Sequence, residues 1–433
     1  MKESQYNLYF NLDETTHVVY NTLTGATVET DKEGIKAIQE TKEEKFDQKT
    51  IQDLAENGIW VDNNADESKI IEVLHEHYKY FGDRAYICTY ITFNCNLSCE
   101  YCYLEYFTGK PSLYMRNEIA QAVARFAKNI VLDNRCNELV TVFTGGEPLL
   151  NFSRISTIIT VLDEEMRKQR IDYQSIIFSN GTSLTEGMLD ELSQYRVFFQ
   201  VTLAGSKEVH NRKRPYRNGK GTYDDIIRAL TMLKDYEVDF ALRIDVDNEN
   251  FNTIEDMLDD IIEKAGTNLY IKFFPIIPGA KTACPWIDSC FKLSEYRKLS
   301  TLWRLARQKG FKVLETPLIK LAYCDYHTNR SYILDPNGDV YKCGAVVGNK
   351  KLKIGSLNLS GELIGLNYRY HDWMSRNPLR MTKCHGCKFL PACGGGCAGV
   401  VHDIYDTYHG SDCREKYLIL ERVKFYLEGL KKK

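Results

Sequence analysis

The sequence lacks any apolar run long enough to cross a membrane and any block of basic residues. No stretch approaches the roughly 18 apolar residues that a spanning helix needs, and the polar start MKESQYN contains no apolar signal region. The 56 Lys and Arg residues nearly balance the 59 Asp and Glu residues, for a net charge of −3. Since no basic stripe is present to attract phosphates, we expect a cytoplasmic protein without a nucleic-acid or membrane partner.

The sequence also has too few cysteines for a disulfide scaffold. Its 14 cysteines are spread over 433 residues, and a chain of this length stabilises its core without disulfides. Their distribution is uneven, because three lie at Cys95, Cys99 and Cys102 and seven lie between Cys324 and Cys413. In a reducing compartment, such clusters are typical of metal or iron–sulfur ligands.

Residues 1–81 predict a small β3α3 domain similar to a winged helix. Apolar residues alternate over 6–12 and 18–20 and continue at 26–28 after a turn, which predicts a three-stranded meander. Helices are expected near 35–38, 51–55 and 70–81, and the apolar face of the last, which includes His77, is expected to point into the core. The open edge of the third strand would let an extended peptide join as an added strand.

From residue 82 to 310, short β-branched or aromatic runs alternate with amphipathic helices. Six βα units of this kind predict an α/β fold, in which a parallel sheet curls into a partial (β/α)6 TIM-like barrel. Active-site residues are then expected at the C-terminal ends of the strands. The expected strands lie near 86–93, 139–143, 175–179, 197–203, 239–246 and 269–275.

The segment 311–433 is expected to be irregular. Its periodicity is lost from about residue 320, where turn residues and glycines become frequent, as in Cys393-Gly394-Gly395-Gly396-Cys397. We expect this segment to be held together by metal clusters rather than by an apolar core.

A CxxxCxxC motif formed by Cys95, Cys99 and Cys102 follows the first expected barrel strand directly. At the overall cysteine frequency of this chain, the spacing would occur by chance only ~0.015 times. Three thiolates on a short loop can hold three irons of a cubane cluster and leave the fourth iron open. A zinc site would need a nearby fourth ligand, and this loop contains none.

The motif resembles the signature of the radical S-adenosylmethionine (SAM) superfamily. The resemblance implies a [4Fe-4S] cluster on these three cysteines, whose open iron binds SAM. An electron from a reductant such as flavodoxin or ferredoxin would then release a 5′-deoxyadenosyl radical that abstracts a substrate hydrogen. The resemblance also implies the contacts to SAM: Gly145, Gly146 and Glu147 of a GGEP motif for the amino group, Ser179 and Asn180 for the ribose, Thr202 and Arg214 for the carboxylate, and Tyr101 near the adenine.

Two details of these motifs matter for the chemistry. The GGEP glycines are expected to let the ligand approach the backbone closely, because they carry no side chain. Where related enzymes usually have SLDG, this sequence has Thr202-Leu203-Ala204-Gly205. An acidic group is therefore absent, and we assign no catalytic acid or base.

The seven C-terminal cysteines resemble the SPASM extension of radical SAM enzymes, which holds two auxiliary [4Fe-4S] clusters. Paired structural zinc sites are the alternative for CxxC spacings alone. The cluster expected on Cys324, Cys343 and Cys397 lacks an obvious fourth cysteine. Its last iron would take Asp325, His327, Cys284 or Cys290, or stay open for a substrate thiolate. The resemblance implies one cluster on Cys384, Cys387, Cys393 and Cys413 and the other on Cys324, Cys343 and Cys397.

The complete layout resembles that of ribosomal-peptide maturases, whose N-terminal domain captures a precursor's leader peptide. It implies a leader-recognition domain over 1–81, a radical SAM barrel over 82–310 and a SPASM domain over 311–433. The expected activity is crosslinking of a ribosomally made precursor peptide, with a cysteine thioether of the sactipeptide or ranthipeptide type as the first expectation.

Three alternatives stay open. A carbon–carbon crosslinking maturase cannot be separated from a thioether maturase by sequence. An anaerobic sulfatase-maturating enzyme, which makes formylglycine, is disfavoured by the extra N-terminal domain and by Gly344, since those enzymes carry Asp after the cysteine equivalent to Cys343. A non-catalytic, metal-bound scaffold that only binds peptides is disfavoured by the intact CxxxCxxC motif.

Overall fold

The computed structural model describes residues 1–102, 104, 112–276 and 289–430. It divides into two compact units, each with its own internal contacts. The barrel unit comprises 81–314 and 325–375, and the terminal unit comprises 1–80, 315–324 and the chain from Arg376 onward. These units differ from the three consecutive segments expected from sequence, because residues 311–433 are divided between them. The functional boundaries of those three segments stay a prediction.

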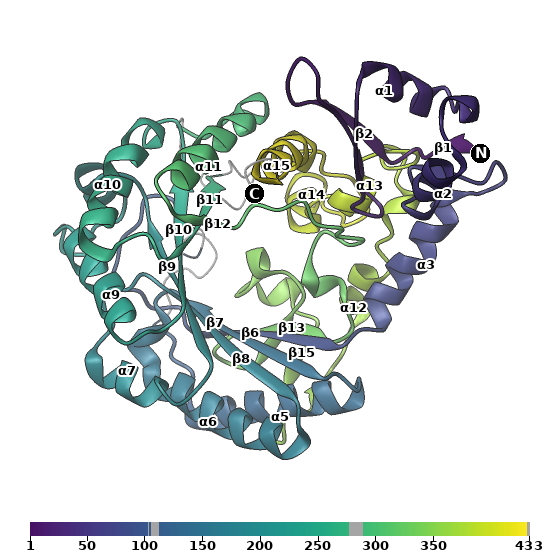
Figure 1. The fold of residues 1–433 in the computed structure, drawn as a ribbon. Coiled ribbons are helices and arrows are strands. Elements are labelled where there is room, and N and C mark those ends of the chain that lie inside the picture. The colour runs from purple at the N-terminus through teal and green to yellow at the C-terminus, as the bar shows by residue number, and fades with distance from the viewer. Residues whose placement is uncertain (103, 105–111, 277–288, 431–433) are drawn as a thin grey trace. The chain divides into compact units, whose positions relative to one another are not determined.

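A parallel sheet forms the centre of the barrel unit, as predicted. Its strands are hydrogen-bonded in chain order and stand along a curve, with helices on its outer side (Figure 1). All six predicted barrel strands are confirmed: β6 (Arg84–Thr92), β7 (Glu138–Gly145), β8 (Asp172–Ser179), β9 (Val197–Leu203), β10 (Phe240–Val246) and β11 (Tyr270–Pro275).

Amphipathic helices connect these strands and cover the sheet. In α10 (Ile254–Ala265), Ile254, Met257, Leu258 and Ile261 follow helical spacing and are fully buried. Burial of each such side chain contributes roughly 1.5–3 kcal/mol to folding. None of the helices that the structure describes is long and apolar enough to cross a membrane. The other connecting helices are α5 (Asn117–Asp133), α6 (Phe152–Gln169), α7 (Glu186–Leu192), α8 (Lys207–Lys213), α9 (Tyr223–Asp235) and α11 (Leu299–Gln308).

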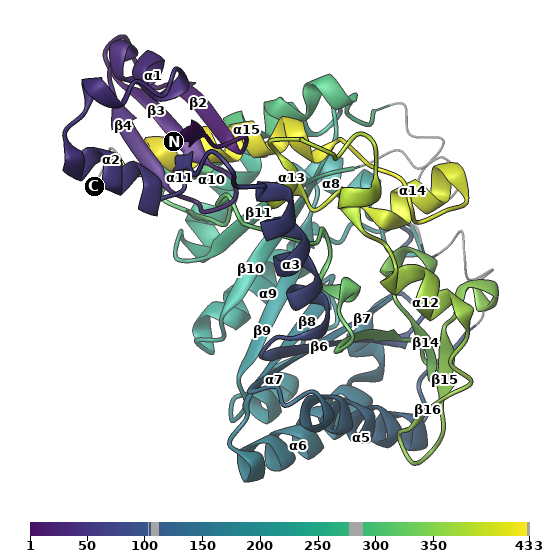
Figure 2. The same ribbon diagram turned by 90° about the vertical axis from the view of Figure 1, so that its right-hand side faces the viewer.

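Strands from the segment expected to be irregular extend this sheet at both edges. The strand β12 (Lys312–Val313) pairs with β11, and β13 (Ser331–Leu334) pairs in parallel with β6. Three antiparallel strands follow (Figure 2), namely β14 (Asp339–Tyr341), β15 (Gly355–Leu357) and β16 (Leu363–Ile364). Strands of two to four residues are too short for alternation to reveal them, and they form here because an existing edge supplies their partners.

The predicted three-stranded meander is confirmed in the terminal unit, as β2 (Asn7–Asn11), β3 (His17–Asn21) and β4 (Thr27–Thr30). One face packs Val19 against Ile38 of α1 (Lys32–Gln39), Leu54 of α2 (Gln48–Glu56) and Trp60. Leu8, Phe10, Val18 and Tyr20 lie on the opposite face and are also buried. The short pair β1 (Lys2–Glu3) and β5 (Trp60–Val61) adds to this region.

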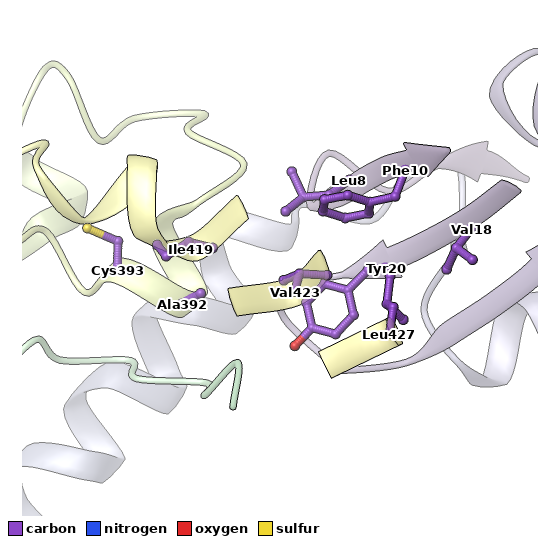
Figure 3. Packing of buried hydrophobic residues seen from close by; sticks show 9 residues of the cluster. All are labelled: Leu8, Phe10, Val18, Tyr20, Ala392, Cys393, Ile419, Val423 and Leu427. Atoms are coloured by element: carbon purple, nitrogen blue, oxygen red, sulfur yellow. The ribbon is translucent and has the colours of Figure 1, made fainter. Parts of the chain in front are cut away.

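The second face of the meander is covered by the C-terminal helix α15 (Glu415–Leu430). Its Ile419, Val423 and Leu427 follow i, i+4, i+8 spacing and pack with Leu8 and Tyr20 (Figure 3). The expectation that the C-terminal segment lacks an apolar core is therefore wrong. A sheet with apolar residues on both faces needs a second cover, and sequence distance hides where that cover comes from.

Helix α3 (Glu67–Tyr80) is present, but the face expected to be buried is wrong. Ile71, His75 and Lys79 are buried, whereas Val73 is 69% exposed. His77 is exposed, so it is not a core residue. Polar contacts fix the rotation of the helix: Glu67 accepts hydrogen bonds from Ser4 Oγ and Gln5 N, and His75 Nδ1 lies 2.8 Å from the Leu321 carbonyl. The apolar residues Ile70, Val73 and Leu74 remain exposed.

Candidate active site

The cysteine loop (residues 95–102) follows β6, at the C-terminal end of the parallel strands. It is held by the turn after α8. The backbone N–H of Ser98 donates to Pro215 O at 2.8 Å, and that of Glu100 donates to Lys213 O, at the end of α8, at 3.0 Å. Arg217 Nε donates to the Cys95 carbonyl at 2.6 Å. Backbone contacts of this kind set the path of the loop independently of what its thiols bind.

The GGEP motif lies directly against the chain that enters this loop. Gly146 N donates to Thr92 O at 2.9 Å, and Glu147 N donates to Asn94 O at 2.8 Å. A Cβ added to Gly145 would lie 2.1 Å from Thr92 O, and one added to Gly146 would lie 2.2 Å from Asn94 O. Close approach of the protein's own backbone therefore already requires both glycines, which differs from the expected reason, the approach of a ligand.

Glu147 joins the ends of β7 and β8. Its carboxylate is fully buried and accepts hydrogen bonds from Ser179 Oγ at 2.8 Å, from Asn180 N at 2.7 Å and from Leu149 N at 3.0 Å. Burial raises the pKa of Glu147 to about 6, although these hydrogen bonds oppose the shift. Three donors leave this carboxylate with acceptor capacity for one more partner.

Asn180 extends this connection to the cysteine loop. Its Nδ2 donates to Asn96 Oδ1 at 3.0 Å and lies 3.8 Å from Cys95 Sγ, while its Oδ1 accepts from Thr182 N at 2.9 Å. Burial raises the pKa of the Cys95 thiol to about 12. Sequence reasoning missed Asn96, although its place between the first two cysteines of the motif was a signal for it.

Arg214 is a buried cation beside the loop. Its Nη1 donates to Tyr101 Oη at 3.0 Å and lies 3.9 Å from Asp245 Oδ2. Its Nε is buried and has no hydrogen-bond partner in the part of the chain that the structure describes. Burial lowers the pKa of Arg214, but the neighbouring Cys99, Tyr101 and Asp245 outweigh burial and raise it. Thr202 lies on the adjacent β9, in register with Arg243 of β10.

Lys213 is a second buried cation, and sequence reasoning missed it. Its Nζ lies 2.6 Å from Glu100 Oε1, 2.8 Å from Asp247 Oδ2 and 2.5 Å from Glu249 Oε2, and its side chain is fully buried. These three carboxylates lie close enough together to hold a metal ion, but the ammonium group of Lys213 already pairs with all three. Burial lowers the pKa of Lys213, and the carboxylates outweigh burial and raise it. The position of Asp247 directly after β10 was the sequence signal that could have indicated this cluster of charges.

The four cysteines expected to share one auxiliary cluster lie in the terminal unit. Other members of this set raise the pKa values of Cys384 and Cys393. The pKa of Cys384 is raised to about 11, first by burial and then by Cys413 and Cys387. The pKa of Cys393 is raised to about 12, first by burial and then by Glu415, Cys384 and Cys387. Cys387 and Cys413 therefore act on the Cys384 thiol, and Cys384 and Cys387 act on the Cys393 thiol.

The residues expected around the second auxiliary cluster are divided between the two units. Cys324 and Cys397 belong to the terminal unit, and Cys343 belongs to the barrel unit. There, Tyr90 Oη donates to the carbonyl of the neighbouring Gly344 at 3.3 Å. Asp325 and His327 also belong to the barrel unit, where the His327 ring stacks on Trp373 at 4.3 Å.

The cysteines outside both motifs have different surroundings. Cys88 is buried in an apolar cluster. Burial raises the pKa of Cys290 to about 11, and its charged neighbours are Asp247 and Lys213. Cys136 is buried and lies 3.7 Å from the Gly82 carbonyl. Cys284 lies outside the described residues.

Comparison with known proteins identifies the superfamily. Residues 89–261 match the family described as the Radical SAM superfamily. These residues form a radical SAM domain. The radical SAM domain runs from β6 into α10 and contains the cysteine loop, the GGEP motif and Arg214. The chain is therefore an enzyme that contains a radical SAM domain, and this family uses a [4Fe-4S] cluster and SAM.

Several characterised proteins resemble the chain beyond this domain. The radical SAM cyclopropyl synthase TigE of Paramaledivibacter caminithermalis is 23% identical over 93% of this chain and 90% of its own length. A cysteine-type anaerobic sulfatase-maturating enzyme of Clostridium perfringens is 23% identical over 77% of this chain and 92% of its own length. The structure of Streptococcus suis SuiB bound to precursor peptide SuiA covers 95% of this chain and 99% of SuiB, with a TM-score of 0.57 and 16% identity.

Proposed function

We propose that this enzyme is a radical SAM maturase that modifies a ribosomally made precursor peptide. The observation that carries the proposal is the cysteine loop, which Asn180 and Glu147 tie to the ends of three neighbouring parallel strands. The likeness to SuiB and TigE over more than nine-tenths of the chain supports a peptide substrate, because SuiB was crystallised with its precursor peptide. The sulfatase-maturating relative extends over a smaller share of this chain.

The residues of the site fit a [4Fe-4S] cluster and SAM. Cys95 and Cys102 are free thiols on the loop, and thiolates are the ligands that iron–sulfur clusters require. The buried Nε of Arg214 has no acceptor among the described residues, and a guanidinium suits the SAM carboxylate. When bound, the cluster and SAM supply a 5′-deoxyadenosyl radical that removes a hydrogen atom from the substrate.

In the proposed site, different groups of residues bind the cluster and the separate parts of SAM. Cys95, Cys99 and Cys102 hold the cluster, and Arg214 and Thr202 bind the SAM carboxylate. Glu147 uses its remaining lone pair to accept a hydrogen bond from the SAM amino group. The other proposed contacts are Gly145 and Gly146 to the same group, Ser179 and Asn180 to the ribose and Tyr101 near the adenine.

The auxiliary cysteines form the second part of the proposal. Cys384, Cys387, Cys393 and Cys413 hold one [4Fe-4S] cluster, which the mutual influence of these thiols supports. Cys324, Cys343 and Cys397 hold the other. A reductant such as flavodoxin or ferredoxin supplies the electrons that these clusters need.

The precursor's leader binds as an added strand beside β4. Among the described residues, β4 pairs only with β3, so its other edge is open. Because Asn21 N donates to Ala26 O, the alternation of an antiparallel ladder directs the N–H groups of Thr27 and Glu29 away from β3. Both side chains are exposed, as expected for residues beside an open edge.

The expected product is a cysteine thioether. A carbon–carbon crosslink is the second candidate, and the likeness to TigE favours it, because a cyclopropyl ring consists of carbon–carbon bonds. The two products differ in whether a thiol is consumed.

Intact mass spectrometry before and after thiol alkylation distinguishes these candidates. The probe is a cysteine-containing peptide encoded beside this gene, incubated without oxygen with the enzyme, SAM and reductant. Loss of two hydrogens together with one alkylatable thiol supports a thioether, and loss of two hydrogens with every thiol still reactive supports a carbon–carbon link. An unchanged peptide mass, with SAM cleaved, would contradict the proposal for this peptide and direct the test to sulfatase peptides.

A further inference from the structure

Arg376 is a buried arginine that, among the described residues, donates hydrogen bonds only to backbone carbonyls. Its side chain is among the largest that are fully buried in this protein. Its Nε donates to Tyr408 O at 2.8 Å and its Nη1 to Gly394 O at 3.4 Å. Its Nη2 donates to the carbonyls of Gly395, Gly396 and Gly410 at 2.9, 3.1 and 3.2 Å.

These contacts hold the glycine loop, residues 394–396, which separates Cys393 from Cys397. All three glycines have positive φ angles, of 61°, 82° and 75°, a conformation that other residues rarely adopt. A Cβ on Gly394 would lie 2.3 Å from Tyr323 N, and one on Gly396 would lie 1.9 Å from Asp412 O. The loop therefore has one tight path, and the guanidinium binds a carbonyl of every residue along it.

Arg376 has no acidic partner in the described part of the chain. None of its hydrogen bonds or ion pairs there involves a carboxylate. Burial lowers the pKa of Arg376, and the thiols of Cys384, Cys397, Cys393 and Cys324 oppose this shift. A guanidinium stays protonated in proteins, and a buried charge without a counter-charge costs several kcal/mol. The surroundings of Arg376 therefore lack the negative charge that would offset this cost.

We propose that Arg376 is a positioning residue for the auxiliary clusters, which places Cys393 and Cys397 through the glycine loop and provides the counter-charge for both sets of cysteines. This inference rests on the auxiliary clusters of the proposed function. A cluster held by thiolates carries net negative charge, so it supplies the missing partner of Arg376. The same charge favours the reduced, more negative form of each cluster, and its removal lowers the reduction potential.

Arg376→Lys and Arg376→Met separate the two roles. Both are made in a Cys95→Ala, Cys99→Ala, Cys102→Ala background, so that any remaining cluster is auxiliary. The readouts are iron and sulfide content and a redox titration followed by electron paramagnetic resonance. Arg376→Met is expected to lose at least half of the auxiliary iron. In the cluster that remains, the ratio of reduced to oxidised form at a fixed potential is expected to fall tenfold. This change corresponds to a reduction potential that is about 59 mV lower for a one-electron couple. Arg376→Lys is expected to lose iron but keep this ratio within about twofold.

Arg330→Met is the matched control, because Arg330 is also a buried arginine but lies in the barrel unit and donates to the Arg84 carbonyl. It is expected to change neither readout. Full iron and an unchanged ratio in Arg376→Met would overturn the inference. If Arg376→Met is insoluble, the iron content of Arg376→Lys becomes the deciding measurement. Full iron retention in Arg376→Lys would exclude the positioning role. Absence of auxiliary iron in the parent background would instead contradict the auxiliary clusters of the proposed function.

Discussion

The backbone N–H of Asn180 donates to Glu147 Oε2 at 2.7 Å, and this single contact joins the GGEP motif to the end of the next strand. Through its side chain, Asn180 then reaches Asn96 in the cysteine loop. Residues that lie 33 and 84 positions apart in the sequence therefore form one hydrogen-bonded unit. The following predictions test that unit and its surroundings.

The free energy of unfolding is expected to contain a contribution from Glu147 that falls as pH rises. Burial raises its folded-state pKa from 4.5 to about 6, so the folded protein binds the proton more tightly than the unfolded chain does. This tighter proton binding stabilises the folded state by about 2 kcal/mol below pH 4.5. The stabilisation is lost as pH rises through about 6. Glu147→Gln does not titrate and is expected to lack this component. The measurement is the difference in unfolding free energy between wild type and variant, at pH 4.5 and pH 6.5, in cluster-free protein.

A difference that is the same at both pH values would contradict this assignment. Asp335→Asn is the matched comparison, because burial raises the pKa of Asp335 to about 6 as well. Asp335 lies beside the β13–β14 hairpin. Its variant is expected to alter the pH dependence of stability and to leave SAM binding unchanged, whereas Glu147→Gln is expected to weaken SAM binding about 10- to 100-fold.

Lys213→Met is expected to destabilise the cysteine loop strongly. The change leaves Glu100, Asp247 and Glu249 without their shared cation, and breaking a buried ion pair costs about 3–5 kcal/mol. The neighbouring Arg212→Met is the control, because Arg212 forms an exposed pair with Glu249 worth about 1 kcal/mol or less. Urea unfolding of both variants checks the difference. Equal stability of the two variants would mean that the ion pairs of Lys213 do not stabilise this site.

Gly146→Ala is expected to lower the thermal unfolding midpoint by several degrees. Its new Cβ would lie 2.2 Å from Asn94 O and 2.7 Å from Phe93 O, and such overpacking costs about 1–3 kcal/mol or more. Gly187→Ala provides the control, since a Cβ at Gly187 in α7 meets nothing within 4 Å and Ala favours a helix by about 1 kcal/mol. A midpoint unchanged by Gly146→Ala would show that the backbone contact is not required.

Glu29→Pro is expected to abolish leader binding without unfolding the protein. Proline removes a backbone N–H that points away from β3, and edge strands tolerate it at such a position. Val28→Pro is the contrasting variant, because the Val28 N–H belongs to the ladder with β3 and its loss is expected to destabilise the unit. Fluorescence anisotropy of a labelled leader peptide and thermal unfolding are measured on both variants. Leader affinity unchanged in Glu29→Pro would place the leader elsewhere.

Deletion of residues 1–81 would not test leader binding cleanly. Leu8, Phe10 and Tyr20 share their core with α15, so removal of the N-terminal residues would expose Ile419, Val423 and Leu427. A point change on the strand edge avoids this loss of packing.

The features that sequence predicted well are those with local signals. Six strands with β-branched or aromatic runs and amphipathic helices between them were located within a few residues, and cysteine spacing singled out the loop at Cys95. Ser179 and Asn180, which the family resemblance implied as ribose contacts, lie at and directly after the end of β8, and that role stays a prediction. Their contacts, which join Glu147 to the loop, depend on which strands are neighbours and were not predictable from spacing.

Sequence alone predicted the parallel barrel and singled out the radical SAM motif, because periodicity and cysteine spacing are properties of short segments. Tertiary structure decided which face of α3 is buried, that α15 covers the N-terminal sheet, and that β13 extends the barrel beside β6. It also decided that Lys213 and Arg376 are buried cations. Burial and pairing between residues hundreds of positions apart depend on how all segments pack together, and no local pattern contains that information.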